Sequence, residues 1–413
     1  MPQTFVIIGA SLAGGTAAAT LRQDGFDGDI VLIGEESHPP YERPPLSKQY
    51  LRGEVPFEKA LVRPAAFYED NRIDARFGVA ATRVDPAGRR VDLTVGGPVR
   101  YDKLLIATGV RNRRPPIPGL ELPNIFNLRS VDDADIIRTQ IAPGRKAAVI
   151  GMGFIGCEVA ASLRQKGVEV VCIEPSPTPL FRVLGEEVGP VISALHHEHG
   201  VETVFNDVVT GFEGTGRVER VLTKNGRRID CDLAVVGVGV EPVVDFATGS
   251  GLEIDNGILV DEYCETNIPG IYAAGDVANH YHPVFGTRMR VEHWQNAMQQ
   301  SAAAARTMLG KRQSYDPVHW FWSDQYDVNL QYAGFHHTSE QLVVRGDLEA
   351  RDFTAFYLNQ ARVDAVVALN RGKDVRRVMP LIKARLRVDP EQLGDDGVDL
   401  KGLVDDSLSG ART

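Results

Sequence analysis

The sequence predicts an α/β protein in which one βαβ unit occurs twice and a C-terminal α+β domain follows. Three observations predict this arrangement. An apolar run ending in a glycine-rich turn occurs at residues 6–14 and again at residues 149–156. A further apolar run ending in glycine follows each copy, at residues 101–109 and 231–239. Beyond residue 321, short segments of alternating polar and β-branched residues replace the long apolar runs, as is typical of antiparallel strands.

The first copy, VIIGASLAG at residues 6–14, has the pattern that binds the pyrophosphate of a dinucleotide. Its glycines allow a tight turn and let the backbone approach a pyrophosphate at a helix N-terminus. A helix-like stretch at residues 17–22, an apolar run at residues 30–33 and then an acid complete the fingerprint. We expect either Glu35 or Glu36 to bind the adenosine ribose. The residues expected at the pyrophosphate are Gly9, Ser11, Leu12, Ala13 and Gly14.

The second copy, VIGMGFIG at residues 149–156, continues into a helix-like stretch at residues 158–166 and an apolar run that ends at Glu174. A carboxylate accepts hydrogen bonds from a free ribose 2′-hydroxyl and repels a 2′-phosphate. Residues 175–177 supply no arginine for such a phosphate, so NADH is favoured over NADPH. Arg182 is either a pyrophosphate or ribose contact or a surface arginine. The residues expected at this pyrophosphate are Gly151, Gly153, Ile155 and Gly156.

The duplication predicts the domain organisation. In both halves an acid precedes a buried strand and a glycine turn, and these turns add Thr108, Gly109 and Gly239 to the expected cofactor contacts. An Arg- and Pro-rich linker at residues 111–119 separates the halves. A third apolar strand, closing on Gly275 and Asp276, suggests that the first domain resumes after the second. We therefore expect domains at residues 1–110 with 243–320, at 111–242, and at 321–413, the last with strands near 341–344, 354–358 and 363–369 and a helical tail.

Composition excludes several classes of function. The net charge of −10 argues against binding to nucleic acid or to an anionic membrane surface. No apolar run approaches the roughly 18 residues that span a bilayer. The first expected strand begins near residue 4, which leaves no room for a signal peptide. Four scattered cysteines are expected to be buried, reduced thiols, so a cytoplasmic protein is predicted.

Distinctive segments run from end to end of the chain: PYERPPLSK at 40–48, the second fingerprint with Glu158, FRVLG at 181–185, AAGD at 273–276, EHW at 292–294 and FWSDQY at 321–326. In these segments the chain resembles the FAD-dependent NADH:ferredoxin reductases that serve bacterial oxygenases. Ser11 replaces the middle glycine of the first fingerprint, and Gln300 stands where the family often has glycine. The resemblance implies a glutathione-reductase-like fold, FAD in the first domain, NADH in the second, a 2Fe-2S ferredoxin as electron acceptor and, indirectly, a terminal oxygenase.

The resemblance also implies roles for individual residues. Asp276 would bind the ribityl chain and open a helix directed at the flavin, or it is a plain helix N-cap. Lys48 and Glu158, from different domains, would lie near the isoalloxazine ring. Without the resemblance, they would be a solvated lysine and an ordinary first-turn acid. Trp322 would belong to the ferredoxin interface, or it is a core aromatic. The residues that complete the expected FAD site are Lys48, Ala81, Arg129, Gly275, Asp276, Glu292, His293 and Trp294.

The related flavin disulfide reductases need a redox cysteine about 30 residues after the first fingerprint, where this chain has none. Cys157 lies inside the second fingerprint helix and is expected to be packed there. Electrons must then leave the flavin directly for a one-electron metalloprotein. A rubredoxin as acceptor, or an NADH-sensing flavoprotein of the apoptosis-inducing-factor kind, stays open as an alternative.

Two further features have simple interpretations. The basic stretch at residues 371–387 either attracts an acidic partner or is the solvated face of a helix paired with the acidic stretch at 389–406, and we favour the solvated face. His280 and His282 lack partners with metal-ligand spacing, so no metal site is expected.

Overall fold

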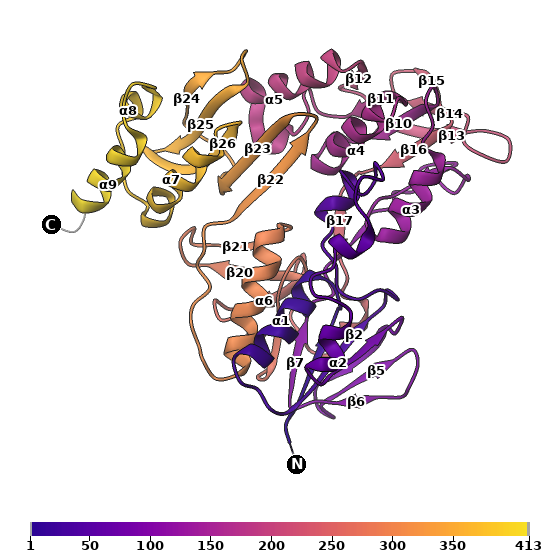
Figure 1. Cartoon of the computed structure of the whole chain (residues 1–413), viewed down its shortest axis with the longest axis vertical. Coiled ribbons are helices and arrows are strands. Elements are labelled where there is room, and N and C mark those ends of the chain that lie inside the picture. Colours follow the sequence, from indigo (N-terminus) through magenta and orange to yellow (C-terminus); the bar gives the residue numbers. More distant parts are fainter. Residues whose placement is uncertain (1, 411–413) are drawn as a thin grey trace. The chain divides into compact units, whose positions relative to one another are not determined.

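The structure is a computed structural model that describes residues 2–410, and the chain folds into two compact units (Figure 1). The first unit contains residues 2–42, 57–111 and 241–321. The second contains residues 43–56, 112–240 and 322–410. The chain therefore enters each unit more than once.

The first unit is centred on a parallel five-stranded sheet in the order β19-β7-β1-β2-β3. Phe5 and Ile7 lie in the core shared with helices α1 and α6, whereas Val6 and Ile8 lie in the core on the other face. Because both faces are covered, the strands are continuously apolar instead of alternating. The elements are β1 (Thr4–Ile8), α1 (Leu12–Gln23), β2 (Asp29–Gly34), β3 (Ile73–Phe77), β7 (Lys103–Ile106), β19 (Ile271–Ala273) and α6 (Trp294–Met308).

Smaller elements complete the first unit. One antiparallel sheet orders β4-β5-β6, and another sheet orders β18-β20-β21. Strands β8 and β17 pair as a two-stranded sheet. The elements are η2 (Phe57–Lys59), α2 (Ala66–Asp70), β4 (Ala81–Asp85), β5 (Arg90–Leu93), β6 (Val99–Arg100), β8 (Val110–Asn112), β17 (Val240–Pro242), η3 (Asp245–Ala247), β18 (Ile258–Val260), β20 (Ala278–His282) and β21 (Thr287–Arg290).

The second unit contains the second parallel sheet, in the order β12-β11-β10-β16-β9, and a three-stranded antiparallel sheet β13-β14-β15. Helix α5 is kinked at Gly185, whose φ is 74°. The elements are η1 (Pro44–Ser47), β9 (Ile125–Phe126), α3 (Val131–Gln140), β10 (Lys146–Ile150), α4 (Phe154–Gln165), β11 (Glu169–Glu174), α5 (Phe181–Glu198), β12 (Val201–Phe205), β13 (Val209–Glu213), β14 (Arg220–Thr223), β15 (Arg228–Asp230) and β16 (Leu233–Val236).

The C-terminal part of the second unit is a five-stranded sheet in the order β22-β23-β26-β25-β24, and the three strands predicted from sequence are confirmed as antiparallel neighbours. Three helices follow them (Figure 1). Within residues 2–410, no helix has the length and apolar character needed to cross a membrane. The elements are β22 (Trp320–Gln325), β23 (Val328–Gly334), β24 (Gln341–Asp347), β25 (Asp352–Asn359), β26 (Arg362–Leu369), α7 (Gly372–Ala384), α8 (Pro390–Gly394) and α9 (Leu400–Gly410).

The internal duplication extends to single hydrogen bonds. Asp102 accepts the backbone N–H of Thr4 at 2.7 Å, and Asp232 accepts that of Lys146 at 2.9 Å. In each half, therefore, the acid before the returning strand fixes the start of the first strand. The first glycine of each turn also donates to the end of the second strand, Gly9 to Ile33 and Gly151 to Ile173, each at 2.8 Å.

Candidate functional site

The first glycine turn leaves a helix N-terminus open for an anion. Gly9 has a φ of 106°, and a Cβ atom there would lie 2.2 Å from the carbonyl oxygen of Ala107. A Cβ atom on Gly14 would lie 1.8 Å from the carbonyl oxygen of Gly9, so both positions require glycine. Ser11 is the N-cap of α1, but its side chain makes no capping hydrogen bond. The first-turn N–H groups, which begin at Leu12 and Ala13, therefore remain for a pyrophosphate.

The second glycine turn has the same construction. Gly151 has a φ of 93°, and a Cβ atom on Gly156 would lie 1.9 Å from the carbonyl oxygen of Gly151. Gly153, the N-cap of α4, is the position that corresponds to Ser11, and a Cβ atom there would meet nothing within 4 Å. Ile155, in the first turn of α4, is 46% exposed. The residues therefore fit a second pyrophosphate that approaches the backbone at Gly153.

The acid after the second fingerprint is tied to the glycine turn. The two carboxylate oxygens of Glu174 accept the backbone N–H groups of Met152 at 2.6 Å and Ser176 at 2.9 Å. In the first unit, Glu35 is exposed just beyond β2, whereas the carboxylate of Glu36 accepts a hydrogen bond from the hydroxyl of Tyr41. Both halves thus place an acid at the carboxyl end of the second strand, where the ribose of a dinucleotide lies in this kind of fold.

One prediction about Asp276 is wrong: this residue neither opens nor caps a helix. Residues 276–277 form a turn, and strand β20 follows immediately at Ala278. The helix N-terminus that packs beside Gly275 belongs to α6, since a Cβ atom on Gly275 would lie 3.8 Å from the Cα atom of Ala297. The fully buried Gln300 of α6 accepts the N–H of Gly275 at 2.9 Å. The glutamine that departs from the family pattern therefore positions the Gly-Asp turn.

The other predicted cofactor residues of the first unit lie at the ends of its strands and helices or in the segments between them. Thr108 donates its hydroxyl to the carbonyl of Val243 at 2.8 Å, and Gly109 adopts a φ of 67°. Glu292 is exposed and pairs with Arg290 at 2.8 Å. The remaining members of this group have simple placements: Ala81 begins β4, His293 is the N-cap of α6, and Trp294 is the first residue of that helix and hydrogen-bonds to Glu42.

The predicted residues of the second unit are dispersed. The carbonyl oxygen of Arg129 accepts a hydrogen bond from Arg43, and the Arg129 N–H donates to Asp133 at 2.9 Å. Gly239 has a φ of 100° and follows strand β16. Arg182 is exposed near the start of α5, and among the described residues no hydrogen bond or ion pair assigns it a role. Its assignment to a cofactor stays a prediction.

Lys48 and Glu158 form a buried ion pair, with Nζ 2.8 Å from Oε2 and exposed fractions of 5% and 3%. The solvated-lysine alternative is therefore wrong. Glu158 also lies beyond the first turn of α4, because that helix begins at Phe154 rather than near residue 158. Although sequence analysis assigned the two residues to different domains, residues 43–56 fold with the second unit. Ser162 of α4 supports that placement by donating its hydroxyl to the carbonyl of Ser47 at 2.7 Å.

The remaining donors to Glu158 were missed by sequence analysis. Ser47 donates its hydroxyl to Oε2, and Ser323 donates its hydroxyl to Oε1 at 2.7 Å. Ser323 lies on β22, where residues alternate between buried and half-buried. This alternation places Trp322 and Ser323 on opposite faces of the strand. The period of two within FWSDQ was the signal that could have identified Ser323.

Trp322 is half-buried rather than part of the core, and its indole N–H donates to Asp324 at 3.1 Å. Its neighbours Phe321 and Ser323 are buried. The burial pattern therefore does not favour the interpretation of Trp322 as a core aromatic. Contact with a partner protein stays a prediction.

The four cysteines are free and buried. Burial raises the pKa of the Cys157 thiol well above its ordinary value and raises that of the Cys231 thiol to about 12. The Cys157 thiol donates to the carbonyl of Met152 at 3.5 Å, so it packs against the glycine turn. Because the thiolate is the reactive form, these cysteines are poor nucleophiles.

His280 and His282 do have a third histidine beside them, contrary to the sequence analysis. The rings of His280, His282 and His319 are buried, and one nitrogen from each lies within 4.8 Å of the others. Zinc held at 2.0–2.1 Å in a tetrahedral site brings its nitrogen ligands to about 3.3 Å from one another. Burial first, and then the neighbouring His282 and Arg288, lower the pKa of His280 to about 3. The three imidazoles are therefore neutral, which is also the form that binds a metal ion. The expectation that His280 and His282 lack a third ligand is wrong, and we assign no metal to the cluster.

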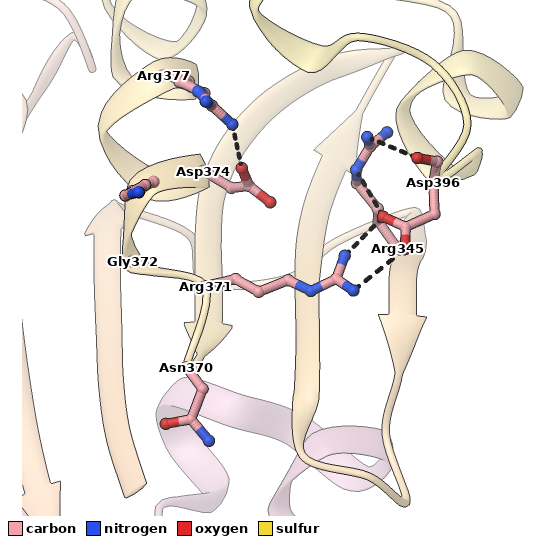
Figure 2. A pocket seen from close by; sticks show the side chains of 8 residues that line it. Arg345, Asn370, Arg371, Gly372, Asp374, Arg377 and Asp396 are labelled. Atoms are coloured by element: carbon pink, nitrogen blue, oxygen red, sulfur yellow. Dashed lines mark hydrogen bonds and ion pairs between the residues drawn. The ribbon is translucent and has the colours of Figure 1, made fainter.

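The basic residues near the start of α7 are paired with carboxylates (Figure 2). Arg371 and Arg345 both meet Asp396, at 2.6 and 3.3 Å, and Arg377 meets Asp374 at 3.0 Å. Asp396 belongs to the acidic stretch that follows α7. These pairs favour the interpretation of this stretch as a solvated, locally neutralised face.

Comparison with known proteins adds to this geometry. Residues 3–301 match the family model of pyridine nucleotide-disulphide oxidoreductases, and residues 320–404 match the model named reductase C-terminal. Rhodocoxin reductase of Rhodococcus erythropolis is 38% identical over 96% of this chain and 93% of its own length. The ferredoxin–NAD(+) reductase component of the anthranilate 1,2-dioxygenase system of Burkholderia cepacia is 40% identical over 97% of this chain and 99% of its own length.

Solved structures agree with these matches. The covalent putidaredoxin reductase–putidaredoxin complex has a chain that superposes with a TM-score of 0.96 at 34% sequence identity. The superposition covers 98% of this chain and 99% of that one. The backbone fold of each unit therefore has a counterpart of known structure.

Proposed function

Since the chain belongs to the pyridine nucleotide-disulphide oxidoreductase family and carries a reductase C-terminal domain, we propose that it is an NADH-dependent, FAD-containing ferredoxin reductase. The observation that carries this proposal is the pair of glycine cradles, at Gly9–Gly14 and Gly151–Gly156, in a single chain without a reactive thiol. One dinucleotide supplies electrons, and the other receives them. The balanced reaction takes NADH and two oxidised ferredoxins to NAD⁺, two reduced ferredoxins and one proton.

FAD, when bound, supplies the conversion of a two-electron hydride donor into a source of single electrons. The first glycine cradle would hold its pyrophosphate, and the exposed Glu35 would take the ribose because Glu36 is engaged by Tyr41. The Gly275–Asp276 turn, fixed by Gln300, would bind the ribityl chain near the N-terminus of α6. Lys48 would place a positive charge beside the reduced flavin, and Glu158 fixes the position of that charge.

NADH would bind at the second cradle, with its adenosine ribose on Glu174. The buried carboxylate already lies at the glycine turn, held by two backbone N–H groups. A 2′-phosphate would bring like charge against it. The exposed Ile155 would cover one side of the nucleotide.

We further propose that electrons leave through Trp322 to a 2Fe-2S ferredoxin that serves an oxygenase, and that the protein works in the cytoplasm. Half-burial of Trp322 supports the first point, and four free buried thiols support a reducing compartment. The domain boundaries at residues 110, 242 and 320 also remain part of this proposal, with residues 43–56 packing in the second unit. The sheet order, in which β19 joins the strands of the first half, supports it.

The direct test is purification followed by anaerobic reduction. The protein should be yellow, carry one non-covalent FAD per chain and lose its colour with NADH. The reduced protein should then reduce 2Fe-2S ferredoxins in a panel that also contains rubredoxins. A colourless protein that does not take up FAD would contradict the proposal. Reduction of rubredoxins alone would identify rubredoxin, in place of ferredoxin, as the acceptor.

A further inference from the structure

A chain of hydrogen bonds leads from the buried ion pair into the C-terminal domain. Oε1 of Glu158 accepts the hydroxyl of Ser323 at 2.7 Å. Ser323 in turn lies 3.3 Å from the side-chain nitrogen of Gln325, two residues along β22 and therefore on the same face. The side-chain oxygen of Gln325 lies 3.0 Å from Nε2 of His196, and Nδ1 of His196 lies 3.3 Å from the hydroxyl of Tyr326.

The donor and acceptor of every hydrogen bond in this series follow from the first bond, the one to Glu158. An ionised carboxylate can only accept, so the single hydroxyl proton of Ser323 points to Glu158. Ser323 can then only accept from Gln325, which must present its nitrogen to Ser323 and its oxygen to His196. Nε2 of His196 consequently carries the proton, and Nδ1 accepts from Tyr326. Burial lowers the pKa of His196 to about 4, which keeps this neutral tautomer at neutral pH.

All four donors therefore point toward the carboxylate. Hydrogen bonds aligned in series polarise one another and strengthen in a low-dielectric interior. Ser323, Gln325 and His196 are each at most 2% exposed, so water does not replace these contacts. On the other side, Oε2 is occupied by Lys48 and Ser47. The carboxylate is thus held at both oxygens.

We propose that Ser323, oriented by Gln325 and His196, is a positioning residue for hydride transfer: it fixes Glu158 and, through it, the ammonium group of Lys48. This inference rests on the proposed function, because it assigns a purpose to the orientation of Lys48. Ser323 itself touches neither nucleotide in the proposal. Its effect reaches the reaction only through the carboxylate.

The test compares the wild type with Ser323→Ala in the FAD-loaded protein. Removing the hydroxyl leaves Oε1 buried without its donor, so Glu158 and Lys48 lose a fixed position. The rate constant for flavin reduction by NADH should fall about tenfold, equal to about 1.4 kcal/mol, while KM for NADH changes less than about twofold. The flavin midpoint potential should become more negative, which is a readout independent of turnover. Ser323→Thr, which keeps the hydroxyl, should restore both values.

Two other variants make the test decisive. Thr354→Val removes a buried hydroxyl from the same C-terminal sheet, one that bonds Asp374 and lies outside the chain. It should leave the rate constant and the potential at wild-type values. Gln325→Leu breaks the next link and should shift both quantities in the same direction as Ser323→Ala, by a smaller amount. It also carries the test if Ser323→Ala does not fold.

Wild-type kinetics and potential in Ser323→Ala, or equal losses in Thr354→Val, would overturn the positioning role. Failure of the proposed function is distinguishable, because the wild-type protein itself would then not be reduced by NADH. The adjacent Trp322 gives a further contrast. Trp322→Ala should alter transfer to ferredoxin and leave flavin reduction intact, the opposite of the pattern expected for Ser323→Ala.

Discussion

Lys48 Nζ lies 2.8 Å from Glu158 Oε2, although the two residues are 110 positions apart in the sequence. Both side chains are almost fully buried. A buried ion pair is tolerated only where additional hydrogen bonds satisfy the remaining atoms, because desolvation of two charges is costly. Ser47 and Ser323 supply those bonds, so a loop, a helix and a C-terminal strand meet at one carboxylate.

Removal of one partner should therefore be costly. Lys48→Met leaves Glu158 buried without a counter-charge, and Glu158→Gln leaves Lys48 likewise, so each should lower the free energy of unfolding by about 3–5 kcal/mol. The double variant should lose clearly less than the sum, because neither charge then remains unpaired. Chemical unfolding of the four proteins measures this coupling, with the exposed Lys166→Met as a control. Additive losses would show that the two side chains are energetically independent.

Glu174 should determine the choice of nucleotide. We expect kcat/KM for NADH to exceed that for NADPH by about a hundredfold, equal to about 2.7 kcal/mol. Glu174→Ala should narrow this ratio by weakening NADH and relieving repulsion of NADPH. Glu169→Ala, at the exposed opposite end of β11, is the matched control and should keep the ratio. An unchanged ratio in Glu174→Ala would place specificity elsewhere, with the exposed Arg182 as the next candidate.

The cysteines of the native protein should not react with alkylating reagents. All four thiols are buried, and burial raises their pKa values, so little thiolate forms at neutral pH. Native protein treated with iodoacetamide should keep full NADH-dependent flavin reduction and show no labelled cysteine by mass spectrometry. Labelling in denaturant is the positive control. Loss of flavin reduction in step with labelling of Cys157 would instead indicate a thiol relay.

Buried histidines should make the fold sensitive to mild acid. Burial lowers the pKa of His196 and His336 to about 4 and that of His280 to about 3, against about 6.5 when unfolded. The unfolded chain therefore binds more protons between these values. The contribution of these neutral histidines to the free energy of unfolding is complete above pH 6.5 and is lost as the pH falls toward 4. Carboxylates with lowered pKa values, such as Asp352, lose their contribution to stability only at still lower pH.

The measurement is the free energy of unfolding between pH 7 and pH 4. Each histidine that stays neutral in the folded protein increases the slope of the unfolding free energy against pH by at most about 1.4 kcal/mol per pH unit. His280→Leu should reduce the slope by about one proton, whereas Lys166→Met, an exposed change at a residue that does not titrate in this range, should leave it unchanged. A slope that His280→Leu does not alter would mean that His280 is already protonated or solvated in the fold.

Substitution of Trp322 should affect electron transfer to ferredoxin but not reduction of the flavin by NADH. Trp322→Ala should leave NADH-dependent reduction of ferricyanide nearly intact, because a small acceptor reaches the flavin without docking. Ferredoxin reduction should fall clearly. Phe356→Ala, a fully buried aromatic of the same sheet, should instead lower stability by about 3–5 kcal/mol and reduce both activities together. Parallel loss in Trp322→Ala would assign Trp322 to the core.

The βαβ units were predictable because their signal is local. A turn that requires glycine at Gly9 and Gly151, a helix N-terminus and a strand ending in acid all lie within about 30 residues of sequence. The structure confirms these elements and the three antiparallel strands of the C-terminal sheet. Both helix starts were placed too late: α1 begins at Leu12 and α4 at Phe154, because each helix starts inside its glycine-rich turn.

Long-range contacts were not predictable in the same way. Ser323 reaches Glu158 from 165 residues away, and His319 reaches His282 through the return of the chain after α6. The wrong expectation for Asp276 has a local cause. Gly-Asp after a strand is a common helix start, but residues 278–282 form strand β20 and the helix begins only at Trp294. Tertiary packing outweighed local propensity there.

Electron counting tests the central claim most directly. Under anaerobic conditions, limiting NADH should be added to the FAD-loaded protein with excess oxidised 2Fe-2S ferredoxin. The cluster and nicotinamide absorbances should be followed together in a stopped-flow instrument. We predict that the flavin is reduced first and that each NADH consumed yields two reduced ferredoxins. Oxidation of NADH with no ferredoxin reduced, or ferredoxin reduction without prior reduction of the flavin, would contradict the proposed route from NADH through FAD to ferredoxin.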